Sequence, residues 1–415
     1  MLAKNPPALR VAVIGGSITG CTAAIELTRA GCEVVLFERS GEELKDRGAG
    51  IGVPSSGIEA YITRGLIAPD VPFFNADSFK RIWRTEAQPV SGYLAWAQPT
   101  NMALLNWGAL YRNLRERVPA GVYRADQRVV ALRNVDDHAE VTLANGAVQT
   151  FDLVVCADGY ASLGRRTLFP AVEATYAGYV LWRGSLPESA LPAAPGPLES
   201  GISALGYPGG HGIFYFVPGV DGATAVGQRL VNWGMYLPAP DLAELMVDRA
   251  GRLHVGSLPP GAMPMATEAR LKAQARARLP GYYADVVQAS HDTYVYAIYD
   301  CEVPAYRVGR LCLAGDAGAF ARPHSGAGAI KGMNDAIALR TALTGGEDLE
   351  TALTAWSLSQ TAIGNRLVQF GNQLGQALVR DIPDWSGMNV QQMAQWFNAL
   401  VTINTEVFDR SQHAR

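Results

Sequence analysis

Residues 10–38 read RVAVIGGSITGCTAAIELTRAGCEVVLFE, and this stretch decides the fold. The apolar run over 10–14 predicts a buried strand, and the apolar spacing over 17–30 predicts a helix with one buried face. Gly31 is well placed to end that helix, and the apolar run over 33–38 predicts a second strand. The order strand, glycine-rich turn, helix and strand is that of a dinucleotide-binding unit.

The turn before the predicted helix is Gly15-Gly16-Ser17-Ile18-Thr19-Gly20. Gly15 permits a tight turn, and Gly20 lets the helix pack closely on the strand. The start of the helix would direct free N–H groups and the positive end of its dipole at a diphosphate. Ser17 replaces the middle glycine of the usual pattern, and its hydroxyl can itself donate a hydrogen bond to a phosphate.

Glu38 ends the second predicted strand, 23 positions after Gly15. A carboxylate there accepts hydrogen bonds from ribose hydroxyls and repels a 2′-phosphate, so it suits FAD or NAD better than NADP. An ordinary glycine-rich turn is the competing interpretation, but it does not explain why strand, helix and acid occur in register. We therefore predict dinucleotide binding through Gly15, Ser17, Ile18, Thr19, Gly20 and Glu38.

Two further motifs each follow a buried apolar strand. Asp158-Gly159 would by itself indicate only a turn. Gly315-Asp316 places a carboxylate where it can reach a ribitol or ribose hydroxyl. Gly326-Ala327-Gly328 opens a helix predicted over 325–343, whose first N–H groups can hold a phosphate or the pyrimidine edge of a flavin.

The composition disfavours several other classes of protein. Of the 415 residues, 48% are hydrophobic and 18% are charged, which is typical of a globular chain with ample core. The net charge of −3 leaves no basic excess for binding nucleic acid. The five cysteines form no C-x-x-C pair, so we expect free thiols in the cytoplasm and no metal site. Without a long apolar run or a signal peptide, we expect no integral membrane association.

The rest of the chain predicts a second domain and a helical end. Aromatic residues alternate over 73–97, as in strands that face a pocket, and residues 129–151 predict a hairpin with a turn at Asn145-Gly146. Residues 176–236 are rich in glycine and aromatic residues and are broken by proline-rich turns, which favours antiparallel strands. Residues 351–415 have the spacing of helices.

Three signatures, taken in order, resemble those of the FAD-dependent aromatic hydroxylases of the p-hydroxybenzoate hydroxylase type. They are GGSITG with Glu38, then CADG at 156–159, then LAGDAGAFARPHSGAGAIKGMNDA at 313–336. The similarity covers essentially the whole chain. The segments NWGALYRNL and YPGGHGIFYFVPG also resemble the branch of this family that hydroxylates dihydroxypyridines. The combined pattern is specific for the family and much less specific for the substrate.

The resemblance implies a role for several polar residues. Glu38 and Arg39 would hold the ribose side of the adenosine, and Asp316 would bind the ribityl chain or the diphosphate. Arg47 and Arg112 would contact the flavin nucleotide.

The same resemblance implies roles for the remaining motifs. Asp158 and Gly159 would belong to the motif that is linked to both FAD and NAD(P)H. Pro323 and the loop Gly326–Gly328 would lie beside the isoalloxazine. Trp107 is a departure, because many relatives carry an arginine at that place.

The implied fold class is α/β with two domains. A Rossmann-like FAD-binding domain of the glutathione-reductase type would receive an inserted, mostly antiparallel β-sheet domain for the substrate, and C-terminal helices would follow. The expected ranges are 1–72, 100–175 and 300–350 for the FAD-binding domain, 73–99 and 176–299 for the substrate domain, and 351–415 for the C-terminal helices.

The resemblance implies an enzyme, a single-component FAD-dependent monooxygenase. NADH or NADPH would bind transiently and reduce FAD, and O2 would then form a flavin 4a-hydroperoxide that an electron-rich, hydroxylated aromatic or heteroaromatic ring attacks. The protein would exclude water, hold this small substrate and promote its ionisation. The choice between NADH and NADPH stays open, because Glu38 belongs to the FAD site and a second nucleotide fingerprint is lacking. A homodimer also stays open.

Two histidines and a proline are the candidates for the chemistry. His211 lies in the glycine-rich stretch PGGHGIF, and a base there would make the ring more nucleophilic by taking its hydroxyl proton. His324 and Pro323 lie just before Gly326, within the segment 322–328 that we call the flavin loop. A solvated turn histidine is the competing interpretation of His211. The side chains expected to line the cavity are Arg183, Tyr207, Tyr215 and Trp233.

Other functions on the same scaffold remain open. One is a flavin oxygenase that acts on a larger polycyclic or non-phenolic substrate. Another is an FAD-binding protein without hydroxylase activity. The W-x-W-x-x-P stretch of flavin halogenases is absent from the sequence, and only one dinucleotide fingerprint occurs.

Overall fold

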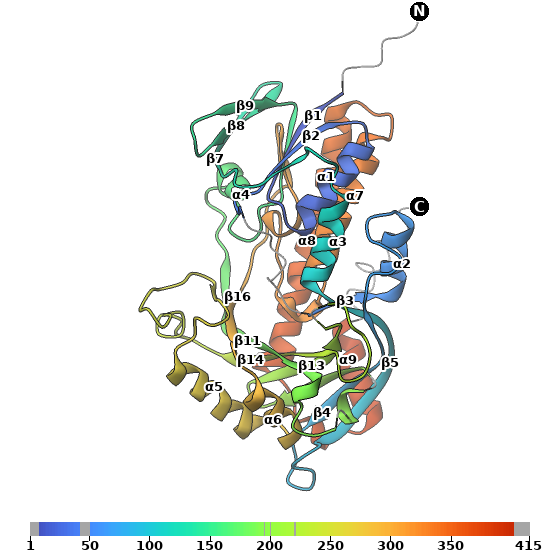
Figure 1. Ribbon diagram of the computed structural model, residues 1–415, viewed down its shortest axis with the longest axis vertical. Coiled ribbons are helices and arrows are strands. Elements are labelled where there is room, and N and C mark those ends of the chain that lie inside the picture. The colour runs from blue at the N-terminus through green and yellow to red at the C-terminus, as the bar shows by residue number, and fades with distance from the viewer. Residues whose placement is uncertain (1–7, 42–49, 195, 200, 220, 402–415) are drawn as a thin grey trace, which may run out of the picture.

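The structure, a computed structural model, describes residues 8–41, 50–194, 196–199, 201–219 and 221–401. A parallel sheet with its helices lies at one end of the molecule, and a larger sheet lies at the other (Figure 1). The long helix α8 (Leu349–Gly375) runs alongside both. The predicted α/β fold with two domains is confirmed.

The parallel sheet has six strands in the order β17-β18-β10-β1-β2-β6. Only the short β17–β18 pairing is antiparallel. The central strands are buried on both faces, which explains why their sequences are continuous apolar runs rather than alternating ones. Its strands are β1 (Arg10–Ile14), β2 (Glu33–Phe37), β6 (Tyr123–Arg124), β10 (Leu153–Cys156), β17 (Arg307–Val308) and β18 (Leu311–Leu313).

Helices flank this parallel sheet. Helix α1 covers most of the range predicted for it, whereas α7 begins three residues later than predicted, because Gly326 takes a left-handed conformation with φ +67°. The helices are α1 (Ile18–Arg29), α2 (Ser55–Thr63), α3 (Trp107–Arg117), α4 (Leu163–Leu168) and α7 (Gly328–Leu343).

A small antiparallel sheet packs beside the parallel one. It consists of β7 (Val129–Val135), β8 (His138–Leu143) and β9 (Val148–Phe151). The turn predicted at Asn145-Gly146 joins β8 to β9, and an additional turn at Asp136-Asp137 divides the first predicted strand in two.

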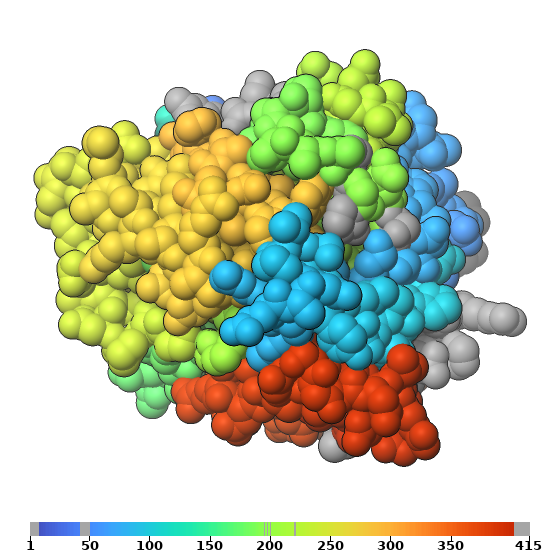
Figure 2. All heavy atoms as spheres, turned by 90° about the horizontal axis from the view of Figure 1, so that it is seen from below, coloured from blue at the N-terminus to red at the C-terminus, as the bar shows by residue number. Residues whose placement is uncertain are grey.

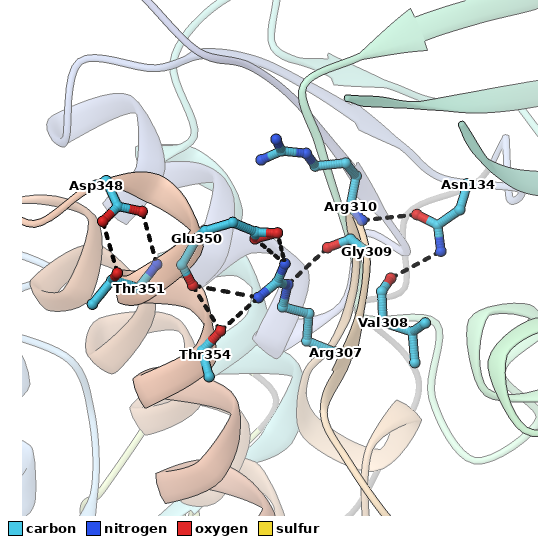
Figure 3. Close-up of polar contacts among 9 residues, drawn as sticks. All are labelled: Asn134, Arg307, Val308, Gly309, Arg310, Asp348, Glu350, Thr351 and Thr354. Carbon is cyan, nitrogen blue, oxygen red and sulfur yellow. Dashed lines mark hydrogen bonds and ion pairs between the residues drawn. The ribbon is translucent and has the colours of Figure 1, made fainter. Parts of the chain in front are cut away.

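Polar contacts tie this small sheet and α8 to the turn after β17 (Figure 3). The amide of Asn134 donates to the Val308 carbonyl (2.9 Å) and accepts from the Arg310 N–H (2.7 Å). Arg307 pairs with the Glu350 carboxylate and donates to the Thr354 hydroxyl (2.9 Å) on α8. The turn therefore connects three parts of the dinucleotide-binding half.

The larger sheet has nine strands in the order β15-β16-β11-β14-β13-β12-β4-β5-β3. All neighbours are antiparallel except β12 and β4, which agrees with the predicted antiparallel domain. β5 crosses the boundary expected at residue 100, and β3 comes from a range expected in the other domain. The strands are β3 (Gly50–Pro54), β4 (Phe74–Trp83), β5 (Tyr93–Asn106), β11 (Thr175–Pro187), β12 (Gly201–Tyr207), β13 (Gly210–Val217), β14 (Leu230–Pro238), β15 (Ser257–Leu258) and β16 (Tyr294–Asp300).

The two faces of this sheet have different neighbours (Figure 1). Helices α5 (Met265–Arg278) and α6 (Gly281–Ala289) cover one face over a large apolar core. The other face is turned toward α8 and the parallel sheet, and it carries a smaller cluster that includes Tyr179, Leu181 and Tyr236. We call this second face the inner face.

The C-terminal segment closes one end of the inner face. After α8 the chain forms a π-helical turn (Gln376–Arg380) and then α9 (Val390–Val401), which lies along the β4–β5 hairpin (Figure 2). The rings of Trp96 and Phe397 meet there at 5.6 Å. Within the described residues, none of the helices has both the length and the apolar character needed to cross a membrane.

Candidate active site

The glycine-rich turn has the geometry that dinucleotide binding requires. Gly15 has φ +98°, and a Cβ there would lie 2.5 Å from the Ala157 carbonyl oxygen. A Cβ on Gly20 would lie 1.8 Å from the Gly15 carbonyl oxygen, so the helix packs this closely against the turn only because Gly20 has no side chain. Ser17 stands at the N-cap of α1 and makes no capping bond within the described structure, which leaves its hydroxyl available.

Glu38 lies next to this turn and is held in place by backbone N–H groups. Its carboxylate accepts from Gly16 N (2.7 Å) and from Ser40 N (2.8 Å). Two carboxylate oxygens have about four acceptor positions, so some remain for ribose hydroxyls. The neighbouring Arg39 is exposed, and Arg112 is half-buried on α3. Arg47 lies outside the described residues.

The second and third motifs meet at the carboxyl ends of β10 and β18. Asp158 accepts from Leu163 N (2.6 Å), and its other carboxylate oxygen is buried without a partner among the described residues. Arg165, which sequence reasoning missed, donates to the carbonyls of Asp316 (3.0 Å) and Ala317 (3.2 Å). Because Arg165 follows the Asp158-Gly159 turn, it links the two motifs.

A buried ion pair, also missed from the sequence, supports the third motif from the other side. Lys331 Nζ donates to the Gly315 carbonyl (2.9 Å) and to Asp335 Oδ2 (2.7 Å). Asp335 Oδ2 also accepts from Gly315 N (2.8 Å). Both backbone polar groups of Gly315 are therefore held by α7, and this fixes the turn that presents Asp316.

Asp316 and the Gly326-Ala327-Gly328 loop come together. The Asp316 side chain is accessible although protein surrounds it, and this partial burial raises the pKa of its carboxyl. A Cβ on Gly328 would lie 3.9 Å from an Asp316 carboxylate oxygen, so the start of α7 lies beside that carboxylate. No side chain caps α7 within the described residues, and its first N–H groups are open to an acceptor.

These residues fit FAD. The N-termini of α1 and α7 offer N–H groups to a diphosphate and to the pyrimidine edge, while Glu38 and Asp316 offer carboxylates to the two sugar-like parts. All of them lie at the carboxyl ends of parallel strands, where ligands bind in open α/β sheets.

Two histidines far apart in sequence meet between the flavin loop and the inner face. His211 Nε2 lies 3.1 Å from His324 Nδ1, and His324 Nε2 lies 2.7 Å from the Tyr179 hydroxyl. The His211 ring stacks on Tyr236 at 4.5 Å. We call His211, His324 and Tyr179 the inner-face chain. Pro323, beside His324, begins the same turn and is exposed.

Burial controls the charge of the inner-face chain. It lowers the pKa of His211 to about 3 and that of His324 well below its ordinary value, so both imidazoles are neutral near pH 7. It raises the pKa of Tyr179 to about 12, so the phenol keeps its proton. Beyond Tyr179 lies Arg322, which pairs with Asp300 at 2.7 Å.

The hydrogen bonds of the inner-face chain can run in either direction. Tyr179 can donate to His324, which then donates to His211, or each bond can be reversed. Both arrangements suit two neutral imidazoles and one phenol, and in each the buried His211 Nδ1 has no partner among the described residues. A switch between the two arrangements moves protons along the inner-face chain, which is what a proton relay requires.

The four side chains expected to line the cavity divide between the two faces of the sheet. Arg183 and Tyr215 lie on the inner face, where the Tyr215 hydroxyl donates to the Gly50 carbonyl (2.9 Å). Tyr207 and Trp233 belong to the core under α5 and α6 instead. Trp233 donates to the Ser290 hydroxyl (2.8 Å) on that side. These two side chains do not join the inner-face site.

The fold and the site together define a dinucleotide-binding oxidoreductase in which the inner face lies opposite the flavin loop. Comparison with family models supports this class. Residues 10–51 match the pyridine nucleotide-disulphide oxidoreductase model, and residues 176–300 match the FAD binding domain-like model.

Known relatives cover nearly the whole chain. A 2,6-dihydroxypyridine 3-monooxygenase from Paenarthrobacter nicotinovorans is 29% identical over 87% of this chain and 89% of its own. A 6-hydroxynicotinate 3-monooxygenase from Bordetella bronchiseptica is 24% identical over 91% of this chain and 94% of its own. The solved structure of 2,6-dihydroxypyridine-3-hydroxylase from Arthrobacter nicotinovorans superposes with a TM-score of 0.82, with 26% identity, over 91% of this chain and 94% of that one.

The chain is similar over most of its length to FAD-dependent aromatic hydroxylases, and it is an enzyme of the monooxygenase type. The resemblance stated from the sequence motifs is confirmed, including its dihydroxypyridine hydroxylase branch.

Proposed function

We propose that this protein is a single-component monooxygenase that hydroxylates a small, hydroxylated aromatic or heteroaromatic ring with O2 and NADH or NADPH. The observation that carries the proposal is the inner-face chain. His324 comes from the flavin loop itself and His211 from the opposite sheet, so a proton path begins where ring and flavin would meet. When bound, FAD supplies the redox chemistry and the activated oxygen.

The chain's own residues would handle the substrate proton. A phenolic ring becomes a better nucleophile when its hydroxyl loses a proton, and His211 is the buried acceptor that we assign to this step. Because burial keeps both imidazoles neutral, His211 would take the substrate proton on one ring nitrogen as it gives the proton of its other nitrogen to His324, which would pass one on toward Tyr179. The roles of His211 and His324 are therefore those of a relay.

The inner face would also keep water away from the reacting atoms. Tyr236 stacks on His211 and lies 4.3 Å from the His324 ring, and Val379 of the π-helical turn packs in the same cluster. An apolar, water-poor site strengthens each hydrogen bond to the substrate and limits loss of activated oxygen as peroxide.

The proposal is tested by oxygen uptake of the FAD-loaded protein with NADH or NADPH. Hydroxypyridines, phenols and hydroxylated polycycles are added in turn, and peroxide is measured in parallel. We expect one ring class to stimulate uptake strongly, with little peroxide and a hydroxylated product. Stimulation by polycycles alone would favour the larger-substrate alternative. No stimulation by any ring, with FAD bound, would contradict the proposal.

A further inference from the structure

Arg183 lies in the middle of the inner face. It pairs across β11 and β14 with Gly234, which pairs with Ile213 on β13, two residues from His211. From a strand spacing of about 4.8 Å and a rise of about 3.3 Å per residue, the Cα atoms of Arg183 and His211 lie about 12 Å apart. Both side chains therefore stand on the same face of the sheet, two strands apart.

Arg183 lacks a carboxylate counter-charge among the described residues, in contrast to Arg229 and Arg322. Arg229 pairs with Glu188 at 2.5 Å, and Arg322 pairs with Asp300 at 2.7 Å. Among the described residues no carboxylate pairs with Arg183, whose Nη2 reaches only two neutral oxygens at 3.4 Å each. Both contacts are long for a hydrogen bond, so the charge is only weakly compensated.

The surroundings of Arg183 are aromatic and neutral. Burial raises the pKa of the tyrosines around it, so their hydroxyl groups carry no charge near pH 7. These tyrosines are Tyr215, Tyr236, Tyr294 and Tyr296. An aromatic wall with one uncompensated guanidinium is suited to a flat, negatively charged ring.

Asn232 positions Arg183. Its side-chain oxygen accepts from Gly50 N (2.9 Å) and from Arg183 Nη2 (3.4 Å), which assigns the other amide atom as the N–H2 group. That Nδ2 is buried and has no partner among the described residues. The neighbourhood therefore has more donors than acceptors, and an anionic oxygen is the group that it lacks.

We propose that Arg183, positioned by Asn232, binds an anionic oxygen on the aromatic substrate, so that the enzyme selects rings with a carboxylate or a ring oxyanion over neutral analogues. This inference rests on the proposed function, because it assumes that the inner face holds the ring. The planar guanidinium can bind either kind of anion through two N–H groups.

The test measures binding to the FAD-loaded protein through the change in flavin absorbance, with O2 and reductant absent. The ligands are salicylate with salicylamide, 6-hydroxynicotinate with 6-hydroxynicotinamide, and 2,6-dihydroxypyridine with 2,6-dimethoxypyridine. In the unaltered protein we expect at least one anion to bind about tenfold or more tightly than its neutral partner. The pair that responds tells whether the anion is a carboxylate or a ring oxyanion.

The variants then assign this preference to the guanidinium. Arg183→Met should weaken that anion about 10- to 100-fold and change its neutral partner by less than about threefold. Arg183→Lys keeps the charge and should restore part of the preference. Arg133→Met is the matched control, since Arg133 is an exposed arginine that pairs with Glu140 on the small sheet. FAD content should stay unchanged in all three variants.

Three results would overturn the inference. The first is that anion and neutral partner bind equally well in every pair. The second is that Arg183→Met and Arg183→Lys weaken the binding of both partners equally. The third is that these variants lose FAD, which would assign Arg183 to flavin binding. Anion selectivity without stimulated oxygen uptake would keep the inference and contradict the proposed function. Stimulated oxygen uptake without anion selectivity would support the proposed function and contradict the inference about Arg183.

Discussion

The buried ion pair Lys331–Asp335 supports the turn at Gly315, and the substitution Lys331→Met tests this role. Both side chains are almost fully buried, and they hold the backbone of Gly315. Burial opposes the charge on Lys331, but Asp335 and Tyr306 together outweigh it and raise the pKa of the lysine. Methionine keeps the length of the side chain, removes the charge and leaves the Asp335 carboxylate buried without its partner.

The expected cost follows from that unpaired carboxylate. Removal of one partner of a buried ion pair lowers the free energy of unfolding by about 3–5 kcal/mol. The Gly315 carbonyl also loses its donor, which should weaken FAD binding about fivefold through the adjacent Asp316. Lys272→Met is the matched control, because Lys272 and Glu268 form a more exposed pair with the same i,i+4 spacing, at 3.8 Å. Its cost should be below about 1 kcal/mol.

The assay is urea unfolding followed by tryptophan fluorescence and circular dichroism, with FAD affinity measured on the apoprotein. The double variant Lys331→Met with Asp335→Leu removes both charges and should recover most of the lost stability without recovering FAD affinity. If Lys331→Met unfolds like Lys272→Met, or if the double variant is no more stable than Lys331→Met, the account of the pair as the support of the flavin turn is wrong.

Three other predictions concern the site. Asp316→Ala should lose most of its FAD during gel filtration, because the carboxylate beside the start of α7 is removed; retention of FAD would refute this. His211→Ala should keep FAD but reduce coupled hydroxylation about 100-fold or more, with peroxide rising, whereas the exposed His291→Ala should behave normally. Because burial lowers the pKa of His211 to about 3 from its ordinary value of 6.5, its neutral form stabilises the fold above pH 6.5, and this contribution is lost as pH falls toward 3. His211→Asn should therefore reduce the fall in the free energy of unfolding between pH 6.5 and pH 3. An unchanged fall would contradict the burial argument.

The nucleotide-binding half could be predicted because its determinants are local. Gly15 and Gly20 are required by close approaches within one turn, and Glu38 follows at the spacing set by one helix and one strand. Asp158 and Asp316 could be placed because each follows a buried parallel strand. Short-range geometry and apolar runs carry this information in the sequence itself.

The inner-face site could be predicted only in part, because it depends on strand register. His211 and His324 were separate candidates in the sequence, and 112 positions lie between them. Their contact requires β13 to meet the flavin loop. Tyr207 and Trp233 show the limit most clearly, because a one-residue shift in a strand moves a side chain to the opposite face. Their strands are buried on both faces, so no alternation of buried and exposed positions chooses between the faces.

The supporting polar residues could not have been found from the sequence. Arg165 bonds to backbone carbonyls that only the folded turn brings near, and Lys331 appears in sequence as an ordinary helical lysine. Arg183 was expected in the cavity as one of several candidates. Its importance comes from the absence of a partner carboxylate among the described residues, which only the assembled sheet reveals.

The most direct test of the central claim is the fate of the oxygen atoms when the FAD-loaded protein turns over under 18O2. With NADH or NADPH and the ring that stimulates uptake most, the account predicts one 18O atom in the ring product for each reduced nucleotide consumed. A ring product whose new oxygen comes from water, or reductant consumption that yields only peroxide with every ring tested, would contradict the assignment of this protein as an aromatic hydroxylase.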